Sequence, residues 1–288
     1  MKTLKANRLF SFIAVTLVYV LATTLGVLIY RVLPLHWALN LLVADAVATV
    51  VTFLFSLIFD NASVYDPYWS VQPPVILVCF AFGNKISLLS WLLLAVIGIW
   101  AVRLTANWAY TFSGLNHQDW RYTMLKEKTG VFYPVINFLG IHMVPTLVVY
   151  ACTLPAVYVV MNPLHAWNYL SIPFLCISIL AVIIQGVSDI QMHQYRKHRT
   201  TPFIRTGLWK HSRHPNYLGE LLMWWGVGLA TVSAYPNAWY LLLGAALNTL
   251  LFFCVSIPMA DGRQSAKPGF STYKAETRML LPIPKRKH

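Results

Sequence analysis

Long apolar segments, separated by short polar stretches, follow one another along the chain. Two runs near the start, residues 9–33 and 37–59, each exceed the roughly 20 apolar residues that a membrane-spanning helix needs. Further runs of spanning length follow at residues 86–104, 134–161, 167–188, 217–233 and 239–257. Residues 74–82 are shorter and begin with a proline, which is typical of a tilted or partial span. The pattern therefore predicts an all-α, multi-pass transmembrane bundle with eight crossings, or seven if the short segment is re-entrant.

The composition supports a membrane location and excludes soluble and disordered classes. Hydrophobic residues make up 58% of the chain and charged residues only 11%. A soluble domain of this size has too little interior to bury that much apolar surface. The four cysteines lie inside apolar runs without paired spacing, so neither a disulfide framework nor a zinc site is indicated.

The distribution of positive charge predicts an orientation. The net charge is +13, and all 22 Lys and Arg residues except Arg31 and Lys85 fall on one side of the eight-span arrangement. The positive-inside rule then places both termini in the cytoplasm. Cations in short loops between spans do not indicate nucleic-acid binding. We expect one integral-membrane domain over residues 1–288, with the bacterial inner membrane as the favoured location and the endoplasmic reticulum as the alternative.

Ionisable residues at membrane depth are costly and are candidates for function. Asp45 stands alone in its segment, and we assign it a structural role. Gln185, Asp189, His193 and Arg196 lie at helical spacing on one face if the sixth span continues past the membrane edge. An acid followed by a cation suits a ribose hydroxyl and a phosphate. The alternative is a solvated, salt-bridged helix end.

A second polar cluster opens the seventh span. Pro215 suits the first turn of a helix, whose free N–H groups and positive dipole end attract anions. Arg213 and His214 precede it, and Asn216 and Glu220 lie one turn apart and project together. Gly219, between them, would let another backbone or a flat ring approach closely. The alternative is a capped helix with an interfacial basic collar.

Two further stretches combine polar and aromatic residues. Trp100 and Arg103 share a helical face at the end of the fourth span. Residues 66–74 read as a polar-aromatic loop, which can exist at membrane depth only where it lines a cavity. The histidines are irregularly spaced, and we predict no metal site.

These clusters together resemble the steroid 5-alpha-reductase superfamily, in particular its bacterial branch. One matching stretch reads Asp-Pro-Tyr-Trp-Ser from residue 66, and another reads Arg-His-Pro-Asn-Tyr-Leu-Gly-Glu from residue 213. The others, in chain order, are residues 103–105, 107–108, 119–122, 188–189, 207–209, 273 and 277–282. The matches span most of the chain.

The resemblance implies a membrane reductase that uses NADPH to reduce a carbon–carbon double bond conjugated to a carbonyl in a lipid or steroid-like substrate. The cofactor-binding part would be about residues 185–288. The family pattern assigns cofactor contact to Asp189, Arg196, Asn216 and Glu220, with Arg205 and Tyr217 as further assignments, and Gln185, Arg213 and His214 join them from the clusters above. No obligate protein partner is evident.

The acid that polarises the substrate carbonyl in the steroid reductases matches Asp66. The aromatic hydroxyl that assists it is replaced by Trp100, whose N–H donates a hydrogen bond but delivers no proton. Tyr68 or Tyr65 could supply the hydroxyl instead. Asp66, Tyr68 and Trp100 are therefore the candidate catalytic residues.

Two other function classes remain open. The Arg-His-Pro motif is shared with membrane isoprenylcysteine carboxyl methyltransferases, which use S-adenosylmethionine. Those proteins place an acidic pair after the last span, where this chain has only Asp261. A lipid-binding scaffold or transporter is the non-enzymatic alternative, and inverted repeats would favour it.

Overall fold

The structure is a computed structural model that describes residues 2–163 and 168–283. The described residues form helices and loops, and their one bridge of β type joins Ser212 to Arg278. The all-α fold class is therefore confirmed. Trp167, within an expected span, and Lys285, Arg286 and Lys287 of the basic tail lie outside the described residues.

The chain divides into two compact units, each built from two stretches of sequence. The first comprises Met1–Cys79 and Leu104–Leu154, and the second comprises Phe80–Arg103 and Pro155–His288. Three helices pass from one unit to the other: α4 (Tyr68–Ala81), α5 (Leu88–Thr111) and α8 (Val144–Met161). This division does not test the prediction of a single domain.

The remaining helices of the first unit come from both ends of its sequence. They are α1 (Lys2–Ala6), α2 (Arg8–Val32), α3 (Trp37–Ile58), η1 (Ala62–Val64), α6 (Trp120–Thr129), η2 (Gly130–Phe132), α7 (Tyr133–Ile136) and η3 (Asn137–Met143). Helices α2 and α3 pack against each other as a hairpin. Asn40 holds their turn, because its side-chain amide donates to Leu33 O at 2.8 Å and accepts from Leu35 N at 3.1 Å.

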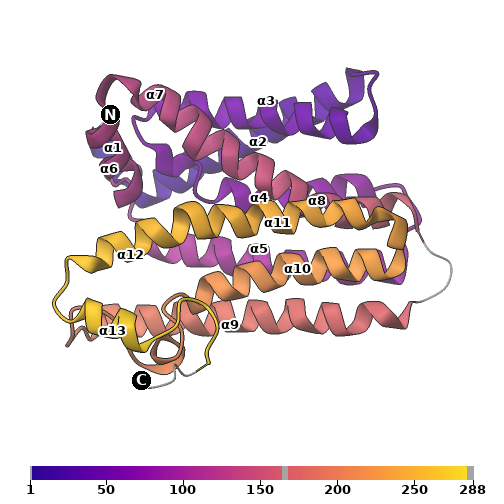
Figure 1. Ribbon diagram of the computed structural model, residues 1–288. Helices are drawn as coiled ribbons and strands as arrows, with labels where there is room; N and C mark the ends of the chain where they lie inside the picture. Colours follow the sequence, from indigo (N-terminus) through magenta and orange to yellow (C-terminus); the bar gives the residue numbers. More distant parts are fainter. Residues whose placement is uncertain (1, 164–167, 284–288) are drawn as a thin grey trace. The chain divides into compact units, whose positions relative to one another are not determined.

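The second unit holds most of the C-terminal half. Its remaining helices are η4 (Tyr169–Ser171), α9 (Ile172–Lys197), η5 (Gly207–Lys210), α10 (Pro215–Ala234), η6 (Pro236–Leu242), α11 (Leu243–Leu251), η7 (Phe252–Ser256), α12 (Ile257–Ser265) and α13 (Phe270–Glu276). Helices α9 and α10 run side by side (Figure 1).

Glycines on α10 allow this close pairing. A Cβ at Gly219 would lie 2.6 Å from Ala181 O, and one at Gly226 would lie 2.1 Å from Ser178 Oγ. The two glycines are seven residues apart, so they lie on the same face of α10. The predicted close approach of another backbone at Gly219 is confirmed. The pairing brings side chains of α9 within hydrogen-bonding distance of side chains of α10.

Six helical stretches are long and apolar enough to cross a membrane, and the chain is an integral, multi-pass membrane protein. They are Arg8–Val32, Trp37–Ile58, Leu88–Thr111, Trp120–Met161, Tyr169–Lys197 and Pro236–Ser265. Helix α4 has 14 residues and α10 has 20, and neither is among the six. The expected count of seven or eight crossings is therefore not confirmed, and the cytoplasmic placement of the termini stays a prediction.

The expected loop over residues 66–74 is wrong from Tyr68 onward, where α4 begins. Pro73 and Pro74 lie inside this helix, and Tyr68 and Gln72, one turn apart, both donate to Asp45 of α3. These bonds pair the Tyr68 hydroxyl and the Gln72 side-chain N–H with a buried carboxylate, whereas Gln72 Oε1 has no partner among the described residues. Helix α9 runs to Lys197, so the condition for placing Gln185, Asp189, His193 and Arg196 on one helix is met. Pro215 begins α10, as expected.

Candidate functional site

Buried Glu220 of α10 lies at the centre of a polar cluster in the second unit. Its Oε2 accepts hydrogen bonds from Trp100 Nε1 at 2.9 Å and from Gln185 Nε2 at 2.8 Å. Its Oε1 accepts from Trp224 Nε1 at 2.9 Å. Both carboxylate oxygens are therefore held by neutral N–H donors from α5, α9 and α10.

Arg103 connects this carboxylate to a second one. Its Nη1 donates to Asp189 Oδ2 at 2.6 Å, and its Nη2 lies 3.9 Å from Glu220 Oε2. The Arg103 and Asp189 side chains are each 16% exposed. Two carboxylates thus share one guanidinium in a largely buried setting, where charges must be paired or hydrogen-bonded. We call Trp100, Arg103, Gln185, Asp189, Glu220 and Trp224 the Glu220 cluster.

The neighbourhood of this cluster contains buried polar atoms without a hydrogen-bond partner among the described residues. They are Arg103 Nε, Gln185 Oε1 and Asn216 Oδ1. Leaving such a group unpaired costs about 1–3 kcal/mol. Since Asn216 lies one turn before Glu220 on α10, the unpaired atoms come from the same three helices that hold Glu220. They are suited to a polar ligand that supplies both donors and acceptors.

The predicted face of α9 is only partly used in this cluster. Gln185 and Asp189 take part, whereas Arg196 is exposed near the helix end. Helical spacing was enough to place Gln185 and Asp189 together. Trp224 was missed, and the signal that could have found it is its position one turn after Glu220. Sequence alone does not show that the helix buries this face.

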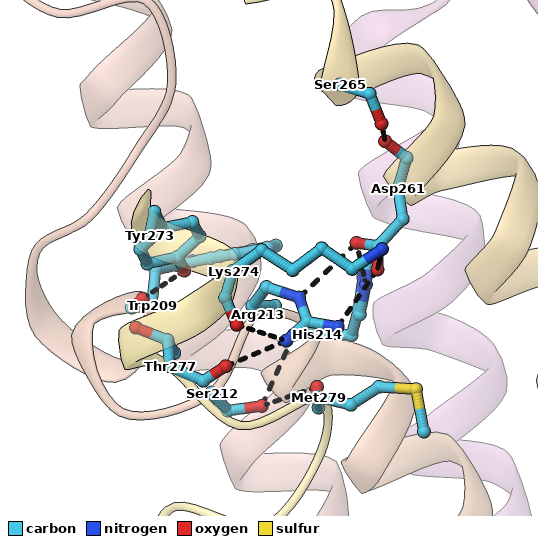
Figure 2. Close-up of polar contacts among 10 residues, drawn as sticks. All are labelled: Trp209, Ser212, Arg213, His214, Asp261, Ser265, Tyr273, Lys274, Thr277 and Met279. Carbon is cyan, nitrogen blue, oxygen red and sulfur yellow. Dashed lines mark hydrogen bonds and ion pairs between the residues drawn. The ribbon is translucent and has the colours of Figure 1, made fainter. Parts of the chain in front are cut away.

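A second cluster surrounds Asp261 of α12 (Figure 2). Arg213 donates from Nη2 to Asp261 Oδ2 at 2.9 Å and from Nε to Oδ1 at 3.4 Å. His214 Nε2 lies 2.9 Å from Asp261 Oδ1, and Lys274 Nζ lies 3.7 Å from Oδ2. One buried carboxylate therefore faces three basic side chains. We call these four residues the Asp261 cluster.

The Asp261 cluster also attaches the C-terminal tail. Arg213 Nη1 donates to Thr277 O at 2.7 Å, and the Arg213 backbone N–H donates to Arg278 O at 3.0 Å. The His214 backbone N–H donates to Met279 O at 3.2 Å. The segment before α10 and the tail thus run alongside each other (Figure 2). In the sequence, Asp261 stands as a lone acid after the last span, and its pairing with Arg213 and His214 was not predicted.

The other predicted basic and aromatic contacts lie at various places in the second unit. Arg205 is exposed, and its Nη2 lies 3.8 Å from Glu276 Oε2. Tyr217 stacks on His214, with ring centroids 5.2 Å apart and an angle of 6° between the ring planes. Arg213 and His214 belong to the Asp261 cluster. Cofactor contact by these four residues stays a prediction.

Asp66, the predicted acid, lies in the first unit and is paired with a phenol. The Tyr122 hydroxyl donates to Asp66 Oδ1 at 2.5 Å. Burial raises the pKa of Asp66 to about 6, although the Arg121 charge and the Tyr122 hydrogen bond act in the opposite direction. A carboxyl with this pKa is protonated in roughly a tenth of the molecules at pH 7, far more often than an ordinary aspartic acid. Asp66 can therefore donate as well as accept.

Tyr68 is paired with Asp45 of α3. The Tyr68 hydroxyl donates to Asp45 Oδ1 at 2.9 Å, and Gln72 Nε2 donates to Oδ2. The Asp45 residue is only 5% exposed. Its isolation in the sequence concealed this pairing, because Asp45 and Tyr68 are 23 residues apart. Buried Asp45 and partly buried Asp66 are therefore both acids next to a tyrosine in the first unit.

Trp100, the third candidate catalytic residue, is fully buried in the second unit. Its indole has one N–H, which donates to Glu220. The geometry thus gives Trp100 a role in holding Glu220, and assistance to Asp66 stays a prediction. Among the described residues, no group of three or more His, Cys, Asp or Glu side chains could hold a metal ion.

Comparisons with known proteins place the chain in a family. An uncharacterised protein of Schizosaccharomyces pombe is 25% identical over 193 residues, which cover 57% of this chain and 56% of that protein. The match thus spans little more than half of the relative's length. No solved structure matches. The model of one family matches residues 52–277, most of the chain, and the chain therefore belongs to the family described as "Protein of unknown function (DUF1295)".

Proposed function

We propose that the protein is an NADPH-dependent reductase that acts on a carbon–carbon double bond conjugated to a carbonyl in a lipid or steroid-like substrate. The observation that carries the proposal is the Glu220 cluster, where two carboxylates share Arg103 and neighbouring buried polar atoms have no partner in the part of the chain that the structure describes. The resemblance of the Asp66 and Arg213–Glu220 stretches to steroid 5-alpha-reductases supplies the reaction class.

The chemistry of the cluster fits a dinucleotide. A nicotinamide carboxamide has one oxygen that accepts hydrogen bonds and two N–H groups that donate them. The oxygen would accept from Arg103 Nε, and the N–H groups would donate to Gln185 Oε1 and Asn216 Oδ1. Ribose hydroxyls are suited to carboxylates such as Asp189. Exposed Arg196, two turns further along α9, offers a cation for a phosphate. These residues, with Glu220, would hold the cofactor.

Residues of the chain would supply the hydrogen bond or proton that the reaction needs. NADPH, when bound, supplies the hydride for the alkene carbon. Asp66, whose pKa burial raises to about 6, would donate a hydrogen bond or a proton to the substrate carbonyl oxygen. That donation stabilises the negative charge that develops on the oxygen. The Tyr68 hydroxyl, held by Asp45, is the second candidate donor.

NADPH oxidation by detergent-purified protein against a panel of enone lipids and steroids tests this proposal. We expect enone-dependent oxidation by the wild-type protein and a loss of at least about 100-fold in Asp66→Ala, the size typical of a general acid. The exposed control Glu127→Gln should keep full activity. No enone-dependent oxidation by a folded protein that binds NADPH would exclude the reaction class.

A methyltransferase that uses S-adenosylmethionine is the second candidate, and one observation favours it. The donors of Arg213 are taken by Asp261 and by backbone carbonyls, which leaves this arginine poorly placed to hold a phosphate. S-adenosylmethionine has no phosphate, and its sulfur is positively charged. Methyl transfer from S-adenosylmethionine to the free carboxylate of a prenylated cysteine analogue, which gives the methyl ester, with no response to NADPH, would favour this candidate.

A further inference from the structure

The first unit contains a cavity of about 300 Å³ that the proposed function does not use. It lies among residues of the C-terminal end of α3 and of α6, α7 and η3, and none of the candidate site residues lines it. The residues that matter for its chemistry are Ser56, Asp60, Gln118, Lys126, Tyr133 and Asn137.

An ion pair lies at this cavity. Lys126 Nζ lies 2.8 Å from Asp60 Oδ1, and the two side chains are 47% and 75% exposed. Lys126 Nζ also lies 5.8 Å from the centroid of the Tyr133 ring. Asp60 has a φ of 47°, the one positive value among the described non-glycine residues. Such backbone strain is found preferentially at binding sites. The cavity therefore has one positive and one negative group in an exposed position.

A buried acceptor completes the polar lining. Asn137 is 2% exposed and donates from Nδ2 to Ser56 Oγ at 3.1 Å. Its Oδ1 is buried and has no hydrogen-bond partner among the described residues. Only a group with an N–H or an O–H can satisfy this oxygen. The unpaired acceptor distinguishes ligands that carry donors from ligands that do not.

Apolar side chains surround the cavity. Leu57 and Val131 line it and are 45% and 88% exposed. Next to them, Ile58, Phe132 and Val135 are 62%, 70% and 53% exposed. These residues belong to two of the six stretches that are long and apolar enough to cross a membrane, so their exposed apolar side chains are suited to contact with lipid chains. A ligand in the cavity can therefore extend hydrocarbon chains along the same surface.

We propose that this cavity binds the headgroup of a phospholipid that carries a primary ammonium, as in phosphatidylethanolamine. Lys126 pairs with the phosphate, and Asp60 pairs with the ammonium, so that the Lys126–Asp60 pair is replaced by two pairs with the lipid. The ammonium also donates to Asn137 Oδ1. A choline headgroup has the same charges but no N–H, and a glycerol headgroup has no cation for Asp60.

Native mass spectrometry of the full-length, detergent-purified protein tests the proposal by titration with ethanolamine, choline and glycerol phospholipids of identical acyl chains. We expect the ethanolamine lipid to bind about tenfold more tightly than the choline lipid, because charge-assisted hydrogen bonds are lost with the N–H groups. Stepwise N-methylation of the ethanolamine lipid should lower the affinity at each step.

Single substitutions in the cavity test which side chains bind the lipid headgroup. Asp60→Asn and Asn137→Leu should each abolish the preference for the ethanolamine lipid over the choline lipid. Lys126→Gln should lower the affinity for both lipids. Lys128→Gln changes the same charge on the same helix but does not line the cavity, and it should leave binding unchanged. Equal binding of the ethanolamine and choline lipids to the wild-type protein would overturn the proposal. So would an unchanged preference in folded Asp60→Asn and Asn137→Leu.

Discussion

At the scale of single residues, Glu220 and Asn216 lie one turn apart on α10 and differ in their hydrogen bonds. Glu220 accepts three hydrogen bonds in the core of the second unit, whereas the Asn216 side-chain oxygen has no partner within residues 2–163 and 168–283. A residue that satisfies its neighbours contributes to stability, and a residue with an unpaired buried atom is available for a ligand. The two residues can therefore be separated by experiment.

Glu220→Gln should destabilise the protein, because one carboxylate oxygen is replaced by an NH₂ group. That NH₂ group would face an N–H of Trp100, Trp224 or Gln185 and could not accept its hydrogen bond. An unsatisfied buried group of this kind costs about 1–3 kcal/mol. Asn216→Ala should leave the free energy of unfolding within about 0.5 kcal/mol of wild type. Thermal unfolding in detergent measures both, with exposed Glu276→Gln as the control. Equal stability of Glu220→Gln and wild type would contradict the assignment.

Asp66 should produce a pH-dependent stability. Burial raises its pKa to about 6 in the folded protein, above its value of 3.8 in the unfolded chain. Its favourable contribution is therefore fully present below pH 3.8 and is lost as the pH rises through about 6. Asp66→Asn cannot ionise and keeps an oxygen for Tyr122. The melting temperature of Asp66→Asn minus that of the wild-type protein should therefore increase as the pH is raised from 4 to 7. A constant difference across this range would show that the pKa is not raised.

At the scale of secondary structure, the contact between α9 and α10 and the attachment of the tail determine the geometry of the second unit. The contact depends on the absence of side chains at Gly219 and Gly226, which brings Gln185 close to Glu220. The tail depends on Asp261, which orients Arg213 and His214 at the start of α10. Both features lie next to the residues that we assign to the cofactor.

Gly226→Ala should destabilise the protein, since a Cβ there would lie 2.1 Å from Ser178 Oγ and 2.7 Å from Phe174 O. Gly186→Ala on α9 is the matched control. A Cβ at Gly186 has nothing within 4 Å, and alanine is preferred to glycine in a helix by about 1 kcal/mol. We expect the two variants to change the melting temperature in opposite directions. Destabilisation of equal size in both would mean that close packing is not the cause.

Asp261→Asn should loosen the C-terminal tail. It removes the charge that holds Arg213, and Arg213 in turn holds the carbonyl of Thr277. Hydrogen exchange at the backbone amides of Arg213 and His214, which donate to the tail, should become faster. The control Glu127→Gln, an exposed position in the first unit, should leave their exchange unchanged. Unchanged exchange in Asp261→Asn would mean that the tail is held independently of this carboxylate.

At the scale of the whole molecule, the apolar pattern was enough to predict an all-helical membrane protein. Helical spacing placed Gln185 with Asp189, and Asn216 with Glu220, because these pairs are local. The partners of Tyr68 and Arg213 could not be predicted, since Asp45 and Asp261 lie 23 and 48 residues away and have no spacing rule. The part of α4 before Pro74 was expected to be a loop, because consecutive prolines usually end a helix, whereas its second half lies in the short apolar segment predicted at residues 74–82.

The cofactor is the central claim, and calorimetry of the purified protein with NADPH and with S-adenosylmethionine tests it most directly. We predict that NADPH binds to the wild-type protein and at least about tenfold more weakly to Asn216→Ala, since a lost hydrogen bond to a buried ligand of about 1.4 kcal/mol corresponds to tenfold. S-adenosylmethionine should produce no heat of binding. Binding of S-adenosylmethionine without binding of NADPH, in a folded protein, would contradict the account.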